Sequence, residues 1–233
     1  MRVPKTKIFL FVLAGIIFSL QTFNPQSLSI PATGYWSLPQ SETNKISVTE
    51  LQPESSVYDN FILTTSENST ELEKFVNKVA NGETEEIRGI FSENIFELPV
   101  VQQPSGQPGF VSTIQNVVTE FEMPKKYGVT GILAHNFLAG EKFFSLEIGQ
   151  QIQVIYGDGS IKTYIITSKQ SYQALSPNSA NSEFVDLGTS EKISATQLFK
   201  RIYMGNHHLT LQTCIQQGLE DSWGRLFIIA EPV

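Results

Sequence analysis

The stretch Leu209-Thr210-Leu211-Gln212-Thr213-Cys214 and the later run Arg225-Leu226-Phe227-Ile228-Ile229-Ala230 decide how this chain is interpreted. Both are rich in apolar and β-branched residues, which predicts two strands. Cys214 is the single cysteine among 233 residues, so it cannot form a disulfide within the chain. Three roles remain open for it: a buried inert thiol, a thiol that awaits a partner, or a nucleophile. The residues around it favour the nucleophile.

Composition and charge narrow the class of protein. Hydrophobic residues make up 40% of the chain and charged residues 17%, as expected for a packed globular domain. The net charge of −7 argues against nucleic acid as a partner. No Gly-rich phosphate or dinucleotide loop is found, and Gly157-Asp158-Gly159 is interpreted as a turn.

The N-terminus has the features of an export signal. Three basic residues precede the run Ile8–Leu20, which is apolar except for Gly15 and Ser19. This run is shorter than the roughly 18–20 residues of a comfortable membrane span, and no clear small-residue cleavage site follows it. Residues 1–23 are therefore either a cleaved signal peptide or an uncleaved membrane anchor. Either alternative predicts a domain outside the cytoplasm, held at the cell surface or secreted.

The remainder divides into a tether and a folded domain. Residues 24–65 are rich in Ser, Thr, Pro, Gln and Asn without a sustained period, which predicts a flexible tether. Residues 66–233 are predicted to form one domain. Its two helices, over 70–80 and Ala195–Tyr203, have apolar stripes and capping boxes: Thr70 with Glu73, and Ser194 with Gln197.

The rest of the domain has the pattern of short strands. A hairpin is predicted around Ser92-Glu93-Asn94 and another around Gly157-Asp158-Gly159. Strands are predicted over Ile87–Phe91, Ile95–Val101, Val117–Phe121, Val129–Ala134, Gln151–Tyr156, Lys162–Thr167, Leu209–Cys214 and Arg225–Ala230. Many short strands and few helices indicate a mostly β fold, either a closed antiparallel barrel or a sandwich.

A nucleophilic cysteine needs a base and, for its thiolate, a nearby cation. The candidate bases are His135, His207 and His208. On a strand, His208 would lie roughly 20 Å from Cys214, at about 3.3 Å per residue, and His207 would point to the other face. Both are interpreted as solvated or capping residues. His135, where a strand meets a loop, remains as the base or as a structural histidine.

Arg225 is the candidate cation. If a ten-residue loop joins two antiparallel strands after Cys214, Arg225 faces the cysteine across the ladder. There it could stabilise the thiolate and a developing oxyanion. The alternative is a surface arginine paired with Glu220 or Asp221.

In this order the motifs resemble the sortase family of cell-surface cysteine transpeptidases. Thr210–Cys214 resembles the TLxTC signature, Ala134-His135-Asn136 the histidine segment, and Trp223-Gly224-Arg225-Leu226 the arginine strand. Leu146–Ile152 and Tyr156–Gly159 are similar to the mid-barrel strand and hairpin of that family. The resemblance covers residues 98–233 and implies an eight-stranded sortase-type β-barrel.

The resemblance also implies a mechanism and partners. Cys214 would attack the Thr–Gly carbonyl of a sorting-type peptide, His135 would act as general acid and base, and Arg225 would hold the peptide and the oxyanion. Thr213 and Asn136 would contribute to substrate binding. The acceptor would be an amine on the cell wall or on another protein, and an uncleaved N-terminus would add contact with the membrane.

The chain departs from the family pattern at two places. Ala134 stands where the histidine segment usually has Gly, a mild change. The segment from Ser176 to His208 is long, and since this region shapes the substrate groove in the family, substrate choice cannot be transferred.

No cofactor is predicted. Glu83, Glu85 and Glu86 lack the spacing of a calcium loop and are interpreted as a solvated face, so calcium dependence is not supported.

The pentapeptide Ile30-Pro31-Ala32-Thr33-Gly34 resembles a sorting signal. It follows the apolar segment, whereas sorting signals precede one near the C-terminus. It is interpreted as a turn in the tether, with self-processing or self-occupation as the alternative.

Two other functions stay open for the domain. One is a hydrolase on the same barrel that cuts surface peptides without transferring them. The other is a secreted binding module in which Cys214 is buried and inert.

Overall fold

The computed structural model describes residues 70–233, which lie within the domain predicted for residues 66–233. The predicted signal segment (1–23), the tether (24–65) and the pentapeptide Ile30–Gly34 lie outside the described residues. Within residues 70–233, none of the helices combines the length and the apolar character needed to span a membrane.

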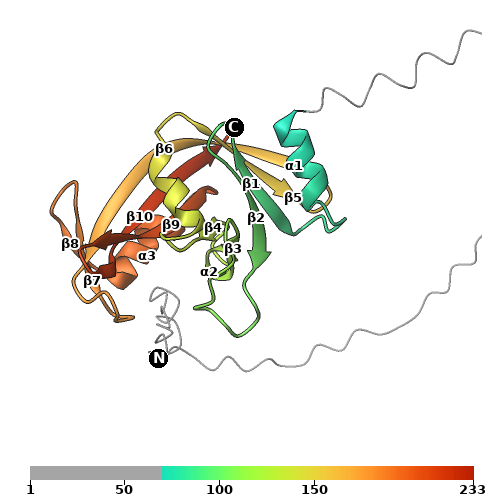
Figure 1. Cartoon of the computed structure of the whole chain (residues 1–233). Coiled ribbons are helices and arrows are strands. Elements are labelled where there is room, and N and C mark those ends of the chain that lie inside the picture. Colours follow the sequence, from blue (N-terminus) through green and yellow to red (C-terminus); the bar gives the residue numbers. More distant parts are fainter. Residues whose placement is uncertain (1–69) are drawn as a thin grey trace, which may run out of the picture. The chain divides into compact units, whose positions relative to one another are not determined.

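The domain is mostly β-sheet with a few short helices (Figure 1). The helical elements are α1 (Glu71–Val79), α2 (Glu122–Lys125), the 3-10 helix η2 (Ala139–Ser145) and α3 (Ala195–Tyr203). The strands are β1 (Ile87–Ser92), β2 (Phe96–Gln102), β3 (Val118–Phe121), β4 (Thr130–Leu133), β5 (Gln151–Tyr156), β6 (Ile161–Ala174), β7 (Glu183–Asp186), β8 (Lys192–Ser194), β9 (Leu209–Gln217) and β10 (Glu220–Pro232).

Eight of these strands close into a barrel, as predicted. The sheet order is β10-β9-β4-β3-β2-β1-β5-β6, and β6 pairs with β10 to complete the ring. Strands β7 and β8 extend the sheet from β6. A closed barrel leaves no unpaired strand edge, so among residues 70–233 the free edge of the sheet is on the short β7–β8 extension.

The prediction of an antiparallel barrel was wrong in one respect, because the barrel is mixed. β2 pairs with β3 in parallel, and β4 pairs with β9 in parallel. Parallel neighbours need a crossover connection. The Pro- and Gly-containing loop over residues 103–117 supplies the first crossover, and the long chain between β4 and β9 supplies the second.

Local signals placed most elements correctly. The Thr70–Glu73 and Ser194–Gln197 capping boxes both form, at the starts of α1 and α3. β1 and β2 pair as the predicted hairpin, and so do β5 and β6. The sequence did not predict β7 and β8, and it predicted only the first part of β6.

Apolar residues gather in two main layers. The first layer fills the barrel and takes residues such as Leu98, Ile132 and Leu211. The second lies on the outer face, where α3 and the β7–β8 pair cover β4, β9 and β10. Alternation along β10 shows the division, since Leu226 belongs to the first layer and Phe227 to the second.

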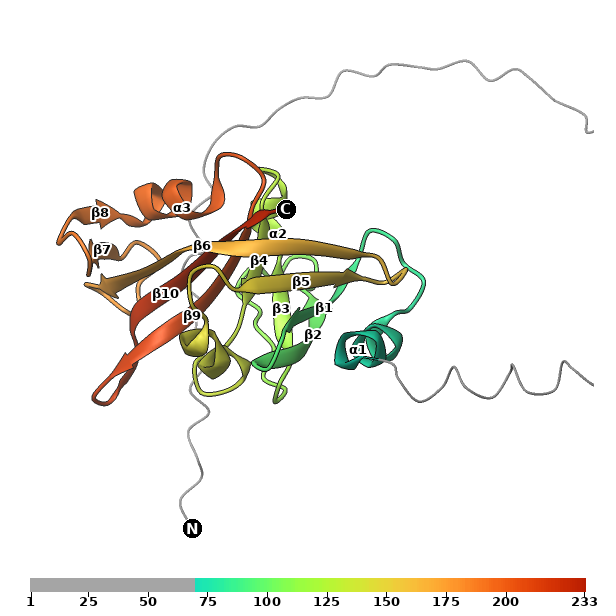
Figure 2. The ribbon, with the colours of Figure 1, turned by 90° about the horizontal axis from the view of Figure 1, so that it is seen from above.

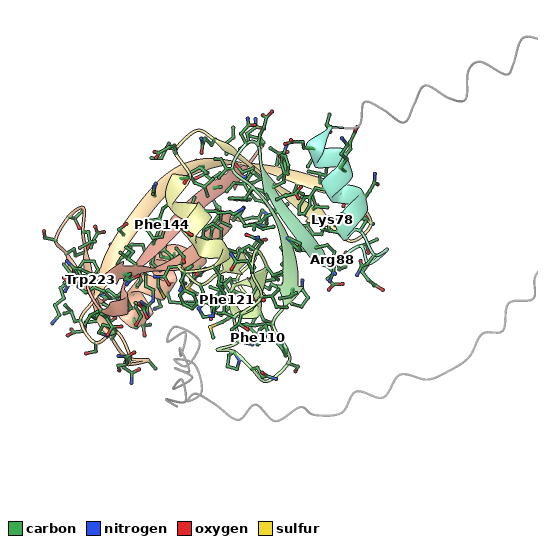
Figure 3. All side chains as sticks on the ribbon, in the orientation of Figure 1. Lys78, Arg88, Phe110, Phe121, Phe144 and Trp223 are labelled. Atoms are coloured by element: carbon green, nitrogen blue, oxygen red, sulfur yellow. The ribbon has the colours of Figure 1, made fainter. Side chains whose placement is uncertain are left out.

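The covering elements sit at opposite ends of the barrel. Figures 1 and 2 show α1 beside β1 and β5, and α3 with β7 and β8 at the far end. Figure 3 shows the same separation, with Lys78 and Arg88 at the α1 end and Trp223 at the other. Phe75 and Val79 of α1 pack on Phe91 and Ile155 in a third, smaller cluster.

Glu120 is a buried carboxylate on β3. Its side chain is 2% exposed, and Oε1 lies 2.6 Å from Lys125 Nζ. Oε2 has no hydrogen-bond partner within residues 70–233. Burial raises the pKa of Glu120, although Lys125 opposes this shift. A carboxyl whose pKa is raised on folding stabilises the fold below its unfolded pKa and loses that contribution as pH rises through the folded pKa.

We therefore expect Glu120→Gln to raise the free energy of unfolding at pH 7.5, and the gain to shrink toward pH 4. The amide keeps the shape of the side chain without a buried charge. Urea unfolding of both proteins across this pH range measures the difference. A variant that is less stable at every pH would mean that the ion pair with Lys125 outweighs the cost of burying the charge.

Candidate active site

Cys214 and Arg225 are direct partners in the β9–β10 ladder. The antiparallel register pairs Arg225 with Cys214 and Leu226 with Thr213. The predicted ten-residue loop between them is wrong, because β9 runs on to Gln217 and β10 begins at Glu220. The register shifts between Glu220 and Gly224, so an irregular ladder replaces the loop.

His135 reaches the same place from β4. The parallel register pairs Leu133 with Gln212, and the Ala134 amide donates to the Gln212 carbonyl at 3.1 Å. His135 follows β4 by two residues, and Cys214 follows Gln212 by two residues on β9. Residues opposite each other on paired strands share a face of the sheet. Gln212 and Cys214 thus lie on the outer face of β9, in the layer under α3.

The thiol of Cys214 is in a mainly apolar environment. The residue is 8% exposed and belongs to the outer apolar layer with Leu133 and Phe227. Burial raises the pKa of Cys214, and the Arg225 charge acts in the opposite direction. Asp221 and Glu220 add to the rise. The surroundings of Cys214 therefore disfavour the thiolate.

His135 is also buried, at 6% exposed. Burial lowers the pKa of His135, and a hydrogen bond to the backbone of Val111 opposes this shift. Its ring stacks on Phe137 with centroids 5.1 Å apart. The His135 carbonyl accepts from the amides of Leu138 and Gly140, each at 3.0 Å, which makes a tight turn after β4.

Arg225 is buried and bound to backbone carbonyls. It is 2% exposed, which excludes the surface arginine considered as the alternative. Nη1 donates to the carbonyls of Ser222 and Gly224, both at 2.8 Å. Nη2 lies 3.5 Å from the Pro177 carbonyl in the β6–β7 loop. This contact is at the limit of a hydrogen bond. Nη2 therefore has more capacity than Nη1 to donate to another acceptor.

Thr213 lies under the site. It is fully buried, and its hydroxyl donates to the Ala134 carbonyl at 2.9 Å. A Cβ on Gly140 would lie 2.3 Å from Thr213 Oγ1 and 2.7 Å from the His135 carbonyl oxygen. Thr213 and the absence of a side chain at Gly140 thus allow η2 to pack closely against β9, the strand that carries Cys214. Thr213 itself does not reach the surface.

Asn136 links two parts of the site. It is half-buried, and its Nδ2 donates to the Asp221 carbonyl at 3.1 Å. This contact ties the turn after β4 to the start of β10.

The other two histidines lie at the far end of β9 and are held by structural contacts. His207 lies 2.7 Å from the Gly128 carbonyl and 2.9 Å from the Tyr164 hydroxyl. His208 contacts the carbonyls of Asn206 and Ile202. Ile202 is near the end of α3, so His208 links the start of β9 to this helix.

The described residues contain no group of three or more His, Cys, Asp or Glu side chains arranged to hold a metal ion. Glu86, one of the three glutamates interpreted as a solvated face, pairs with Arg88 at 3.0 Å.

Sequence reasoning missed three contributors to the site. The Val111 backbone comes from the loop before β3, and nothing in its sequence signals a contact with His135. Gly140 gave no turn signal. Phe137 could have been noticed, because an aromatic residue two positions after a candidate histidine can reach its ring.

Comparison with known proteins gave matches only among solved structures. No protein-family model and no curated protein matches the chain. Sortase A from Corynebacterium diphtheriae is 14% identical over 63% of this chain, with a TM-score of 0.44, and the match spans 60% of that protein. Sortase C1 from Streptococcus agalactiae is 16% identical over 65% of this chain and 69% of its own, with a TM-score of 0.41. The sortase D5 transpeptidase of Clostridium perfringens is 18% identical over 70% of this chain and 87% of its own, with a TM-score of 0.40.

Identities and TM-scores at this level do not assign an activity. The motifs around His135, Cys214 and Arg225 predicted a sortase-type barrel, and the three solved structures named above are sortases.

Proposed function

We propose that this protein is a sortase-like cysteine transpeptidase of the cell surface. It cleaves a sorting-type peptide at a Thr–Gly bond and transfers the acyl part to an amine. The observation that carries the proposal is the pairing of Cys214 with Arg225 on β9 and β10, with His135 two residues past the end of β4, the other neighbour of β9. A nucleophile, a proton donor and a cation within one small region are the parts that acyl transfer requires.

The first half-reaction forms a thioester. The thiolate of Cys214 attacks the carbonyl carbon of the scissile bond, and Arg225 Nη2 stabilises the charge that develops on the oxygen. The C–N bond then breaks, and His135 as imidazolium gives its proton to the departing amine. The thiol and the imidazole supply the thiolate and the imidazolium by exchanging one proton.

The second half-reaction releases the acyl group. An acceptor amine attacks the thioester, neutral His135 takes its proton, and the Cys214 sulfur departs as thiolate. Water in place of the amine would give a free acid. The hydrolase on the same barrel thus differs only in which nucleophile reaches the thioester first.

The inert binding module stays as the second candidate because burial and a raised thiol pKa suit a structural cysteine equally well. The feature that weighs against it is the pairing of a buried arginine with this thiol. A buried guanidinium is costly, and its Nη2, 3.5 Å from the Pro177 carbonyl, has donor capacity that a structural role does not use.

Thiol-dependent peptide cleavage is the direct test. We expect the protein to cleave a fluorogenic LPxTG-type peptide library and to join the product to added amine. Cys214→Ala should lower kcat/KM by about 10⁴-fold or more, and Arg225→Lys by about 10²-fold to 10³-fold. Mass spectrometry separates the amine adduct from the free acid.

His207→Gln is the matched control, because His207 lies at the far end of β9, and it should leave turnover unchanged. Free acid as the single product would favour the hydrolase. Absence of turnover together with slow alkylation of Cys214 would favour the binding module.

The pKa shifts predict a broad pH profile. The pKa of His135 is lowered from 6.5 and that of Cys214 is raised from 9.0, so the limbs of the kcat/KM profile should lie outside this interval. The form of the protein that has both the thiolate and the imidazolium is then a minor fraction at every pH.

Asp221→Asn should shift the alkaline limb of the profile to lower pH, because the Asp221 charge contributes to the raised pKa of Cys214. The pH dependence of Cys214 alkylation by iodoacetamide checks this independently of turnover. A shift of this limb to higher pH would contradict the effect of the Asp221 charge on the pKa of Cys214.

Gly140→Ala tests the packing beneath the site. The added Cβ would push against Thr213 Oγ1 and the His135 carbonyl, so His135 should shift relative to Cys214. A displacement of about 1 Å can cost roughly 10²-fold in rate, and we expect a loss of kcat/KM of that order. Gly109→Ala is the control, since a Cβ there meets nothing within 4 Å. Equal activity in both variants would show that the contact does not position His135.

A further inference from the structure

Phe137 stacks on the ring of His135. The two ring centroids are 5.1 Å apart and the planes are inclined by 25°, so the rings stack. Phe137 itself is 52% exposed, whereas His135 is 6% exposed. An exposed aromatic ring carries an unfavourable apolar surface. We refer to this exposed ring, stacked on the buried imidazole, as the cover of His135.

A second contact fixes the edge of the same imidazole. His135 hydrogen-bonds to the backbone of Val111 in the loop between β2 and β3. Gln103 holds this loop, because its Nε2 donates to the carbonyls of Pro108 and Phe110 at 2.9 and 3.0 Å. Its Oε1 accepts from the Glu122 amide at 3.2 Å, which anchors the side chain at the start of α2.

The two contacts act on different degrees of freedom. A hydrogen bond to one ring nitrogen selects the tautomer and leaves the other nitrogen for proton transfer. A ring stacked on the imidazole face opposes rotation of the side chain and keeps water from that face. Neither Phe137 nor Val111 offers a proton or a charge to a substrate, so both contacts act through His135.

We propose that Phe137 is a positioning residue, whose phenyl ring shields His135 from water and holds its imidazole against the Val111 backbone and beside Cys214. The inference deepens the proposed function, on which it rests, by identifying what controls the proton donor of that site. The backbone contact of Val111 takes the place that a carboxylate or amide occupies in other cysteine–histidine sites.

The neighbouring strands carry the other charged groups of the site. Cys214 lies on β9, and Glu220, Asp221 and Arg225 lie on β10. No substitution of Phe137 changes any of these groups. A change in the titration of His135 would therefore report on the cover itself.

The test is the titration of His135 by NMR of the imidazole nitrogens in the full-length protein. The chain has three histidines, so His135→Gln assigns the signal. We expect Phe137→Ala to raise the pKa of His135 toward its ordinary 6.5, because water then reaches the ring. Phe137→Tyr should keep the original titration, since its ring can stack in the same way.

Phe144→Ala is the matched control. Phe144 lies in η2, seven residues further along, and is 41% exposed (Figure 3). It should leave the titration of His135 unchanged. An unchanged or lowered pKa in Phe137→Ala would overturn the proposal, and so would an equal rise in Phe144→Ala.

Turnover gives the second readout. The acid limb of the kcat/KM profile should move with the pKa of His135 in Phe137→Ala, while Phe137→Tyr restores it. If Phe137→Ala shifts the NMR titration and no form of the protein cleaves peptides, the cover stands and the transpeptidase proposal fails. If cleavage occurs and the titration does not move, the cover fails and the transpeptidase proposal stands.

Discussion

The parallel pairing of β4 with β9 is the constraint on which the site depends. It joins residues 130–133 to residues 209–212, segments that are far apart in the chain. A shift by one residue would turn His135 toward the barrel interior, because strand side chains alternate between faces. The apolar side chains of Ile132 and Leu211 oppose such a shift, since both fill the barrel. Packing of the core thereby fixes the relation between His135 and Cys214.

The location of the site on the outer face explains its electrostatics. Cys214 lies in an apolar layer between the sheet and α3, where water is largely excluded. Burial disfavours charge, so it raises the pKa of the thiol and lowers the pKa of the imidazole. The same low polarity would strengthen the interaction of Arg225 with an oxyanion. Burial at this position therefore favours the neutral thiol and the neutral imidazole.

The segment between β6 and β9, which packs over the outer apolar layer, is tied to the barrel by polar contacts. Arg201 of α3 bonds to Glu191 at 2.9 Å and lies 3.7 Å from Asp186, which links the helix to the β7–β8 pair. Tyr203 donates to Gln212 at 2.6 Å, two residues before Cys214 on the same face. The Pro177 carbonyl near Arg225 belongs to the loop that enters this region. The long segment between β6 and β9 thus meets the site at several points.

The sequence by itself determined the elements whose signals are local. Capping boxes placed α1 and α3, the Gly157-Asp158-Gly159 turn placed the β5–β6 hairpin, and the order of His135, Cys214 and Arg225 suggested the family resemblance. Only the tertiary structure decided the parallel pairings, the β7–β8 extension, and the contacts of Phe137, Val111 and Gly140 around His135. The reason is physical: caps and turns depend on residues a few positions apart, whereas strand partners and close backbone approaches depend on how the whole core packs.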